Sequence, residues 1–329
     1  MYTPKNLRKA LFSMIQSMGR HSERFARRPG RDFTRKRALP FETLITLLLT
    51  MRAKSIGENL VEHFQCAEDA PSASAFVQQR QKLLPAALEE LYHRFTARLQ
   101  PQKTFHGFRL LAVDGSSLKS AADPRDLASY QPGTERQHGW NLHHINALFD
   151  LENGIYADTL VQKEHEKNEL KALCQMVDRS PISDPVLLLA DRNYEAYNNL
   201  AHLEKRGWKY VIRLRDKGRA SVGGMQLPCQ PEFDFSARLT LGRLTERQLE
   251  RRGLSVPKPY YHIPTGVTFD FLEPGSNGFY SLSVRVVRLC LPSGQTVTLL
   301  TNLDAGHSRP PCCGSSTPSA GESRRRFAA

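Results

Sequence analysis

Long apolar runs are missing from this chain of 329 residues. The longest one, from Leu44 to Met51, is interrupted by Thr46 and Thr50 and is far shorter than the roughly 20 apolar residues that cross a bilayer. The basic N-terminus is followed by neither an apolar segment nor a small-residue cleavage site. The sequence therefore predicts a soluble protein without a signal peptide, and we expect it in the cytoplasm.

Cysteine is also scarce, and its spacing excludes two common stabilising devices. Four cysteines lie singly and the last two are adjacent: Cys66, Cys174, Cys229, Cys290, Cys312 and Cys313. This pattern matches neither a disulfide framework nor a zinc site, so we predict reduced thiols. A chain of this length buries a sizeable core without such crosslinks.

Acidic residues are too few to balance the basic ones. The chain has 46 Lys and Arg against 33 Asp and Glu, a formal net charge of +13 at pH 7. Nucleic acid fits such an excess, because neutralising phosphates releases counterions and gives affinity independent of sequence. A solvated basic loop is the alternative for the densest segment. Within that segment, which also holds Arg20, Arg24 and Arg31, we expect DNA contacts from Arg27, Arg28, Arg35, Lys36 and Arg37.

Residues 1–103 are predicted to form a helical, DNA-binding domain. Apolar residues repeat at helical spacing in stretches that begin near Pro40, Gly57, Ser74 and Pro85. Ser74 is expected to cap the third helix, which runs to Leu84. Short helices beside an arginine cluster are compatible with DNA binding, although many helical bundles bind no nucleic acid.

Residues 104–215 have the pattern of a mixed α/β domain. Strands are predicted over 108–113, 141–150, 155–162, 186–190 and 208–214, with helices over 164–177 and 196–206. The Asn153-Gly154 pair favours a hairpin between the second and third strands. Residues 216–303 are rich in Gly, Pro and alternating patterns, so we predict a β-rich insertion there.

Two aspartates follow buried strands of this predicted sheet. Asp114 comes after the first strand and Asp191 after the fourth. Carboxylates at the ends of adjacent strands are suitable ligands for Mg²⁺, and two such ions can activate an attacking oxygen in phosphodiester chemistry. Capping of a turn or a helix is the alternative role for both residues.

The sequence around these aspartates resembles a known family. The runs 110–116 (LLAVDGS), 188–194 (LLADRNY) and 211–213 (VIR) are similar to the core of insertion-sequence transposases of family four. The resemblance covers residues 40–303 and implies a DDE catalytic domain of ribonuclease H-like fold with a β-rich insertion. It also implies that Asp114 and Asp191 are catalytic metal ligands in a two-metal site for Mg²⁺ or Mn²⁺. The implied partners are double-stranded DNA, at element ends and target, and a second copy in a homodimer of the intact parent.

The third ligand of that family is missing from the sequence as it stands. The family has a glutamate on a helix after the insertion, in the pattern Tyr-x2-Arg-x3-Glu-x6-Lys, which does not occur here. Residues 304–329 instead read DAGHSRPPCCGSSTPSAGESRRRFAA, and we predict an aberrant, disordered tail. With permitted codons, the shifted register from Pro311 onward reads LLRQLYAERWGVEEAVRS, which contains Tyr-x2-Arg-x3-Glu. This predicts a frameshift between about Asp304 and Pro311, and therefore a truncated and catalytically defective chain.

Other polar residues near the aspartates are given simpler roles. Phosphate contacts are predicted for Arg192, Lys209, Arg213 and Arg215. Adjacent side chains on a strand point to opposite faces, so polar packing is expected in place of metal binding for His143, His144 and His165. Local capping is expected for Ser116 and Ser117, since no His-Asp arrangement supports them as nucleophiles. For Asp158 and Glu169 a position near the metal site is the alternative, and a surface salt bridge or a cap is expected.

Three functions remain open from the sequence. The first is a DNA transposase for cut-and-paste transposition, with Mg²⁺-dependent strand cleavage and transfer. The second is a non-catalytic DNA-binding remnant that inhibits a full-length transposase. The third is another ribonuclease H-like nuclease, in which the aspartates find a different third carboxylate. We expect that this chain descends from a transposase and that it now acts as a non-catalytic DNA-binding protein.

Overall fold

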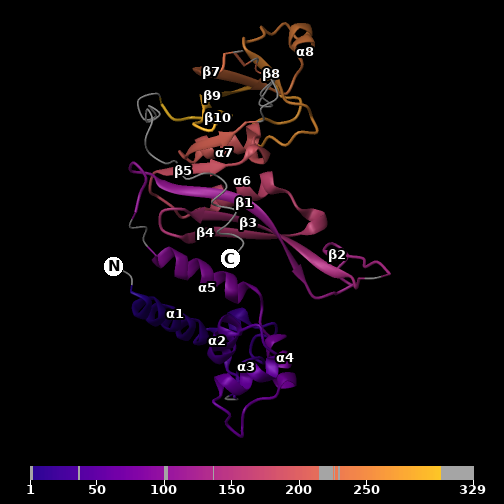
Figure 1. Cartoon of the computed structure of the whole chain (residues 1–329). Helices are drawn as coiled ribbons and strands as arrows, with labels where there is room; N and C mark the ends of the chain where they lie inside the picture. Colours follow the sequence, from indigo (N-terminus) through magenta and orange to yellow (C-terminus); the bar gives the residue numbers. More distant parts are fainter. Residues whose placement is uncertain are drawn as a thin grey trace. The chain divides into compact units, whose positions relative to one another are not determined.

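The structure is a computed structural model, and it describes residues 3–35, 38–99, 103–135, 137–214, 225, 227–228 and 230–304. The chain divides into two compact units, Met1–Gln100 and Pro101–Ala329, which are described separately (Figure 1). Within the described ranges, no helix has both the length and the apolar content that a membrane crossing requires.

The first unit is helical. Its elements are α1 (Pro4–Gly19), the 3-10 helix η1 (Ser22–Phe25), α2 (Phe41–Thr50), α3 (Ile56–His63), α4 (Ala73–Arg80) and α5 (Ala86–Arg98). Ser55 and Glu58 form a capping box at the start of α3. The cap of α4 is Ser72 and not Ser74 as predicted, because the Ser72 hydroxyl accepts the N–H of Ala75 at 3.2 Å.

The basic segment between α1 and α2 is held to its own unit by an aromatic contact and a few backbone bonds. Phe25 stacks on Phe41 with ring centroids 5.7 Å apart, and both rings are buried in the helical core. The Arg27 N–H donates to the carbonyl of Lys82 at 2.8 Å. The backbone of this segment is therefore fixed near Phe25, while the Arg27 side chain is exposed.

The second unit is built on one mixed sheet. Its strands are β1 (Arg109–Ser120), β2 (Tyr130–Gln131), β3 (Trp140–Asp150), β4 (Ile155–Lys163), β5 (Val186–Ala190), β6 (Lys209–Arg213), β7 (Phe233–Gly242), β8 (Tyr260–His262), β9 (Phe279–Cys290) and β10 (Thr296–Thr301). From β3 the order is β3-β1-β5-β6-β10-β9-β7-β8, and both β2 and β4 pair with β3.

The central strands have the ribonuclease H-like arrangement. β1, β3 and β4 are antiparallel, whereas β5 and β6 run parallel to β1. One helix connects β4 to β5 and the next connects β5 to β6 (Figure 1). The predicted fold class, a ribonuclease H-like mixed α/β sheet with an N-terminal helical part, is confirmed.

Strands β7 to β10 continue the same sheet beyond β6. β10 pairs antiparallel with β6, for example through Leu300 and Ile212, and β9 and β7 follow in turn. The buried Leu239 of β7 and Leu282 of β9 belong to the same apolar core as the central strands. The region predicted as a β-rich insertion is thus joined to the core by backbone hydrogen bonds.

Helices α6 (Glu169–Arg179) and α7 (Tyr197–Lys205) pack on one face of the central strands, and α8 (Glu246–Arg251) follows β7. α6 begins at Glu169 and not at Glu164, because the Asn168 side chain accepts the N–H of Lys171 at 2.9 Å and caps the helix there. Leu170 is 37% exposed. The inner face of α6 buries Leu173, Cys174 and Val177.

A buried ion pair closes the hairpin of β3 and β4 onto β1. Arg109 Nε lies 2.8 Å from Asp150 Oδ2, and Asp150 is fully buried. The other oxygen, Asp150 Oδ1, accepts the backbone N–H of Asn153 at 3.0 Å. Gly154 has a φ of 66°, as the predicted Asn-Gly turn requires. Arg109 and Asp150 therefore tie the turn to the first central strand.

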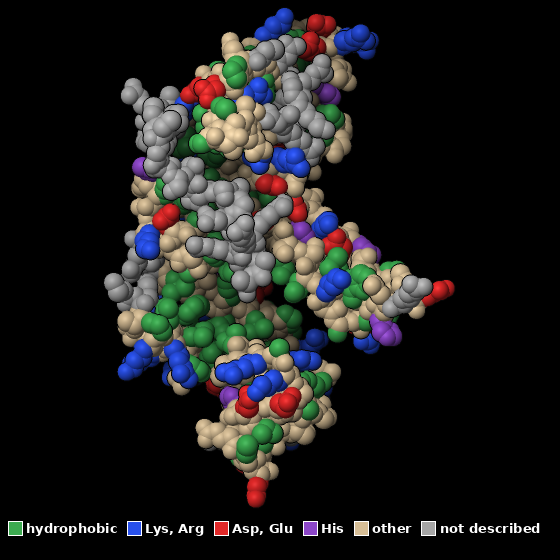
Figure 2. Space-filling view, in the orientation of Figure 1, with side chains coloured by type: hydrophobic (Ala, Val, Ile, Leu, Met, Phe, Trp, Pro, Cys, Tyr) green, Lys and Arg blue, Asp and Glu red, His purple; other side chains and the backbone are tan. Residues whose placement is uncertain are grey.

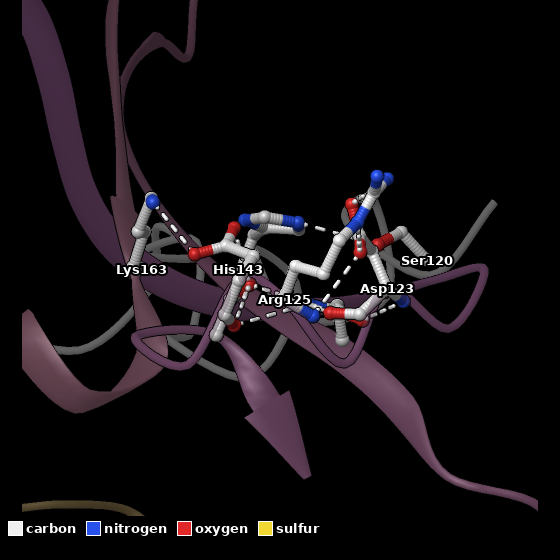
Figure 3. Close-up of polar contacts among 8 residues, drawn as sticks. Ser120, Asp123, Arg125, His143 and Lys163 are labelled. Carbon is white, nitrogen blue, oxygen red and sulfur yellow. Dashed lines mark hydrogen bonds and ion pairs between the residues drawn. The ribbon is translucent and has the colours of Figure 1, made fainter.

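A polar network lies at the far end of β1 (Figure 3). Ser120 Oγ is 3.2 Å from His143 Nε2, and Lys163 Nζ is 2.7 Å from Asp126 Oδ1. The hydrogen bond from Lys163 lowers the pKa of Asp126. His143 therefore takes part in polar packing, as predicted from the sequence.

Candidate active site

Asp114 lies within β1 and not at its end. β3 pairs with β1 from Leu111 through Ser120, and this keeps the backbone extended beyond the aspartate. The prediction that the strand ends at Asp114 is therefore wrong. The residue pairs with Ala147 of β3, and its Oδ1 accepts the N–H of Gly115 at 2.9 Å.

Asp191 directly follows β5. Its side chain caps the short helix η3 (Arg192–Tyr194), since Oδ1 accepts the N–H of Asn193 at 2.8 Å. The capping role considered from the sequence is thus present. The capping hydrogen bond uses Oδ1, and the remaining acceptor sites of the carboxylate are left for further contacts.

The parallel register places the two aspartates at the same level of the sheet. Ala112 of β1 pairs with Leu189 of β5, and Asp114 and Asp191 each lie two residues farther along. Neighbouring strands are about 4.8 Å apart, so side chains at matching positions lie close together. The structure therefore brings together the two predicted metal ligands.

A buried phenol lies beside this pair. Tyr194 is 1% exposed, and its hydroxyl has no hydrogen-bond partner among the described residues. Burial raises the pKa of Tyr194, and the negative charges of Glu169, Asp114 and Asp191 raise it further. The hydroxyl therefore stays protonated and lies in the field of three carboxylates.

His144 and Glu169 form a pair next to Asp114 that the sequence did not reveal. His144 Nε2 lies 2.9 Å from Glu169 Oε1, at ion-pair distance but without hydrogen-bond alignment. The other ring nitrogen, Nδ1, is 3.4 Å from Ser117 Oγ. The serine was expected to be a local cap, and the structure adds this contact with a histidine. The spacing of residues along the sequence does not predict these contacts, because they join β1, β3 and α6.

The predicted basic residues differ in their surroundings. Lys209 Nζ donates to the carbonyl of Asn302 at 3.1 Å, whereas Arg192 and Arg213 are exposed. In the helical unit Arg27, Arg28 and Arg35 are exposed, while Lys36, Arg37 and Arg215 lie outside the described residues. Figure 2 shows Lys and Arg side chains interspersed with acidic ones on the visible face, so no single large basic patch dominates this view.

A complete metal cluster is not present among the residues that the structure describes. No three His, Cys, Asp or Glu side chains in these ranges converge as metal ligands. The tail over residues 305–329, where the sequence predicts a frameshift in place of the glutamate helix, lies outside them. Asp114 and Asp191 are two oxygen donors that each lie two residues beyond the last register pair of β1 and β5.

Two comparisons with known proteins gave a similarity, and both similarities are to transposases. Residues 106–257 match the family model described as a transposase DDE domain. Among solved structures, the chain is similar to the cryo-EM structure of a piggyBac transposase synaptic complex with hairpin DNA, at 10% identity and a TM-score of 0.39. That similarity covers 95% of this chain and 60% of the other, so this chain spans less than two thirds of that transposase. A search of curated proteins gave no match. Both aspartates lie within the matched segment.

Proposed function

We propose that this protein is a DNA transposase of the cut-and-paste type, which acts on double-stranded DNA at the ends of an insertion sequence and at its target. The observation that supports this most directly is the position of Asp114 on β1 and of Asp191 directly after the adjacent parallel strand β5, inside the segment that matches a transposase DDE domain. Phosphodiester cleavage and transfer require charge stabilisation and an activated oxygen, and paired carboxylates support both through bound cations.

Asp114 and Asp191 would hold Mg²⁺ or Mn²⁺ in this proposal. Their oxygen donors suit these hard cations, and the Tyr194 hydroxyl, which has no hydrogen-bond partner among the described residues, offers a further polar group. Bound divalent ions would activate the attacking oxygen and stabilise charge on the phosphate. The protein's own part is to fix the carboxylates through the β1–β5 register.

The basic residues would bind the DNA backbone. Exposed Arg192 directly follows Asp191 in η3, and exposed Arg213 ends β6, so phosphate contacts near the reacting strand are assigned to them. Lys209 is directed to the Asn302 carbonyl and has a structural role in this proposal. The exposed arginines of the helical unit, with Lys36 and Arg37, would bind duplex DNA. Arg215, like Arg213, is assigned phosphate contacts. The intact parent would act as a homodimer.

Restoring the predicted reading frame tests this function. The present chain and a chain continued by LLRQLYAERWGVEEAVRS from Pro311 would be compared in cleavage and strand transfer of element-end DNA with Mg²⁺. The restored chain is expected to gain at least about a thousandfold in rate, since a metal ligand contributes several kcal/mol to transition-state stabilisation. Equal activity of the two chains would refute the account of a defective, frameshifted protein.

A second candidate function is a DNA-binding protein without catalysis. It is favoured by the lack of a third metal ligand within the described residues. It predicts that the present chain binds element-end DNA in a gel-shift experiment, does not cleave it with Mg²⁺, and lowers strand transfer by the restored chain when the two are mixed. Cleavage by the present chain alone would exclude this function.

A further inference from the structure

Glu169 is the described acidic residue that the fold brings next to Gly115, the residue that follows Asp114. It is the first residue of α6, and its side chain is 29% exposed. A Cβ atom added at Gly115 would lie 2.7 Å from Glu169 Oε1 and 2.6 Å from His144 Nε2. The carboxylate of Glu169 therefore occupies the space directly over Gly115, whose own N–H donates to Asp114.

The Tyr194 hydroxyl is an independent sign that this space accommodates a ligand. It is buried and has no hydrogen-bond partner among the described residues, although the charges of Asp114, Asp191 and Glu169 all act on it. A buried hydroxyl without a partner costs about 1–3 kcal/mol unless something else satisfies it. A hydrated cation held by the three carboxylates would provide that partner through its water.

We propose that Glu169 is the third carboxylate of the Asp114–Asp191 cation site in this chain, with His144 as the residue that positions it. The proposal rests on the proposed function, because it assumes a divalent cation at the two aspartates. The three carboxylates do not converge as ligands in the described structure. Ligation therefore requires the Glu169 side chain to turn away from His144, and its partial exposure leaves room for this rotation.

With Glu169 as a ligand, the loss of the family glutamate would not remove the third carboxylate of the cation site. A carboxylate on α6 approaches the aspartates from the helix between β4 and β5, which is fully described. The chain would then bind a divalent cation through its own core without the residues after Asp304. A simple ion pair between Glu169 and His144 would give no such binding.

Mn²⁺ binding to the full chain tests the proposal without an activity assay. Titrations followed by electron paramagnetic resonance would compare the unchanged protein with Asp114→Asn, Glu169→Gln and Glu166→Gln. Glu166 is an exposed glutamate three residues before Glu169, so its variant is the matched control. We expect Asp114→Asn and Glu169→Gln each to weaken Mn²⁺ binding about tenfold or more, and Glu166→Gln to leave it unchanged.

The outcomes separate the two proposals. If Asp114→Asn weakens Mn²⁺ binding and Glu169→Gln does not, Glu169 is no ligand and the proposed function stands. If the unchanged protein binds no Mn²⁺ that depends on Asp114, both proposals fail. Thermal unfolding of each variant checks the fold, and Glu169→Asp provides a milder change should the glutamine variant unfold. It keeps the charge on a shorter side chain, so its affinity is expected between those of the unchanged protein and Glu169→Gln; a loss as large as that of Glu169→Gln would overturn the proposal.

Discussion

The two units of this protein place their functional residues in different ways. In the sheet unit, Asp114 and Asp191 are fixed by the hydrogen-bonded register of β1 and β5. In the helical unit, Arg27 and Arg28 lie on an irregular segment, and their side chains are exposed. A residue placed by register cannot move without disrupting the sheet, whereas exposed charges act together and are partly interchangeable. We therefore expect steep effects from single changes in the sheet unit and graded effects in the helical unit.

The largest effect is expected from removing an aspartate of the site. In the chain with the restored frame, Asp191→Asn should lower strand transfer at least about a thousandfold, because an amide is a poor ligand for Mg²⁺. Asp184→Asn is the matched control, since Asp184 is exposed just before β5. If Asp191→Asn lost no more activity than this control, the steep effects expected for the sheet unit would be contradicted.

Breaking the buried ion pair of the sheet unit should be next in size. Asp150→Asn leaves the Arg109 guanidinium buried without its countercharge, and we expect a loss of roughly 3–5 kcal/mol in the free energy of unfolding. Chemical denaturation would measure it. Asp123→Asn, which breaks the exposed pair with Arg125, should change stability little. Equal losses in both variants would show that burial is not the deciding factor.

A pH-dependent effect is expected from Glu204 of α7. Burial raises the pKa of Glu204 to about 7, from an ordinary value of 4.5. The folded protein therefore holds its proton more tightly than the unfolded chain does, so stability is highest below pH 4.5 and declines as the pH rises toward 7.

Glu204→Gln should remove this decline. Denaturation at pH 4.5 and pH 8 would show a smaller difference between the two conditions than in the unchanged protein. Glu250→Gln, on the exposed side of α8, should retain the full decline. If both variants keep the same pH profile, Glu204 does not carry the pH dependence of the sheet unit.

The smallest single effects are expected in the basic segment of the helical unit. Arg27→Gln and Arg28→Gln should each weaken DNA binding moderately and lower the slope of log affinity against log salt by about 1. Fluorescence anisotropy at several salt concentrations would measure both quantities. Arg247→Gln on α8 is the control and should leave the slope unchanged. A loss of all binding from one of these arginines would contradict the graded behaviour proposed for this unit.

Much of the sheet could be predicted from local patterns. The hairpin of β3 and β4 follows from apolar alternation around Asn153-Gly154, and β5 from an apolar run before Asp191. The end of β1 was predicted wrongly, since residues 115–120 are exposed or half-buried and mostly not apolar, and their pairing with β3 keeps them extended. The start of α6 was also wrong, because the competing cap at Asn168 lies inside a uniformly charged stretch.

The sequence alone determined the order of the five central strands and of α6 and α7, the two aspartates and the basic excess, because these depend on neighbouring residues and on composition. It did not reveal α1 or α8. Only the tertiary structure decided which distant groups meet. The approach of Glu169 and His144 to Gly115 depends on how α6 packs against β1 and β3. The pairing of β10 with β6 joins residues about ninety positions apart. Such contacts arise from long-range register and packing, which no local spacing in the chain encodes.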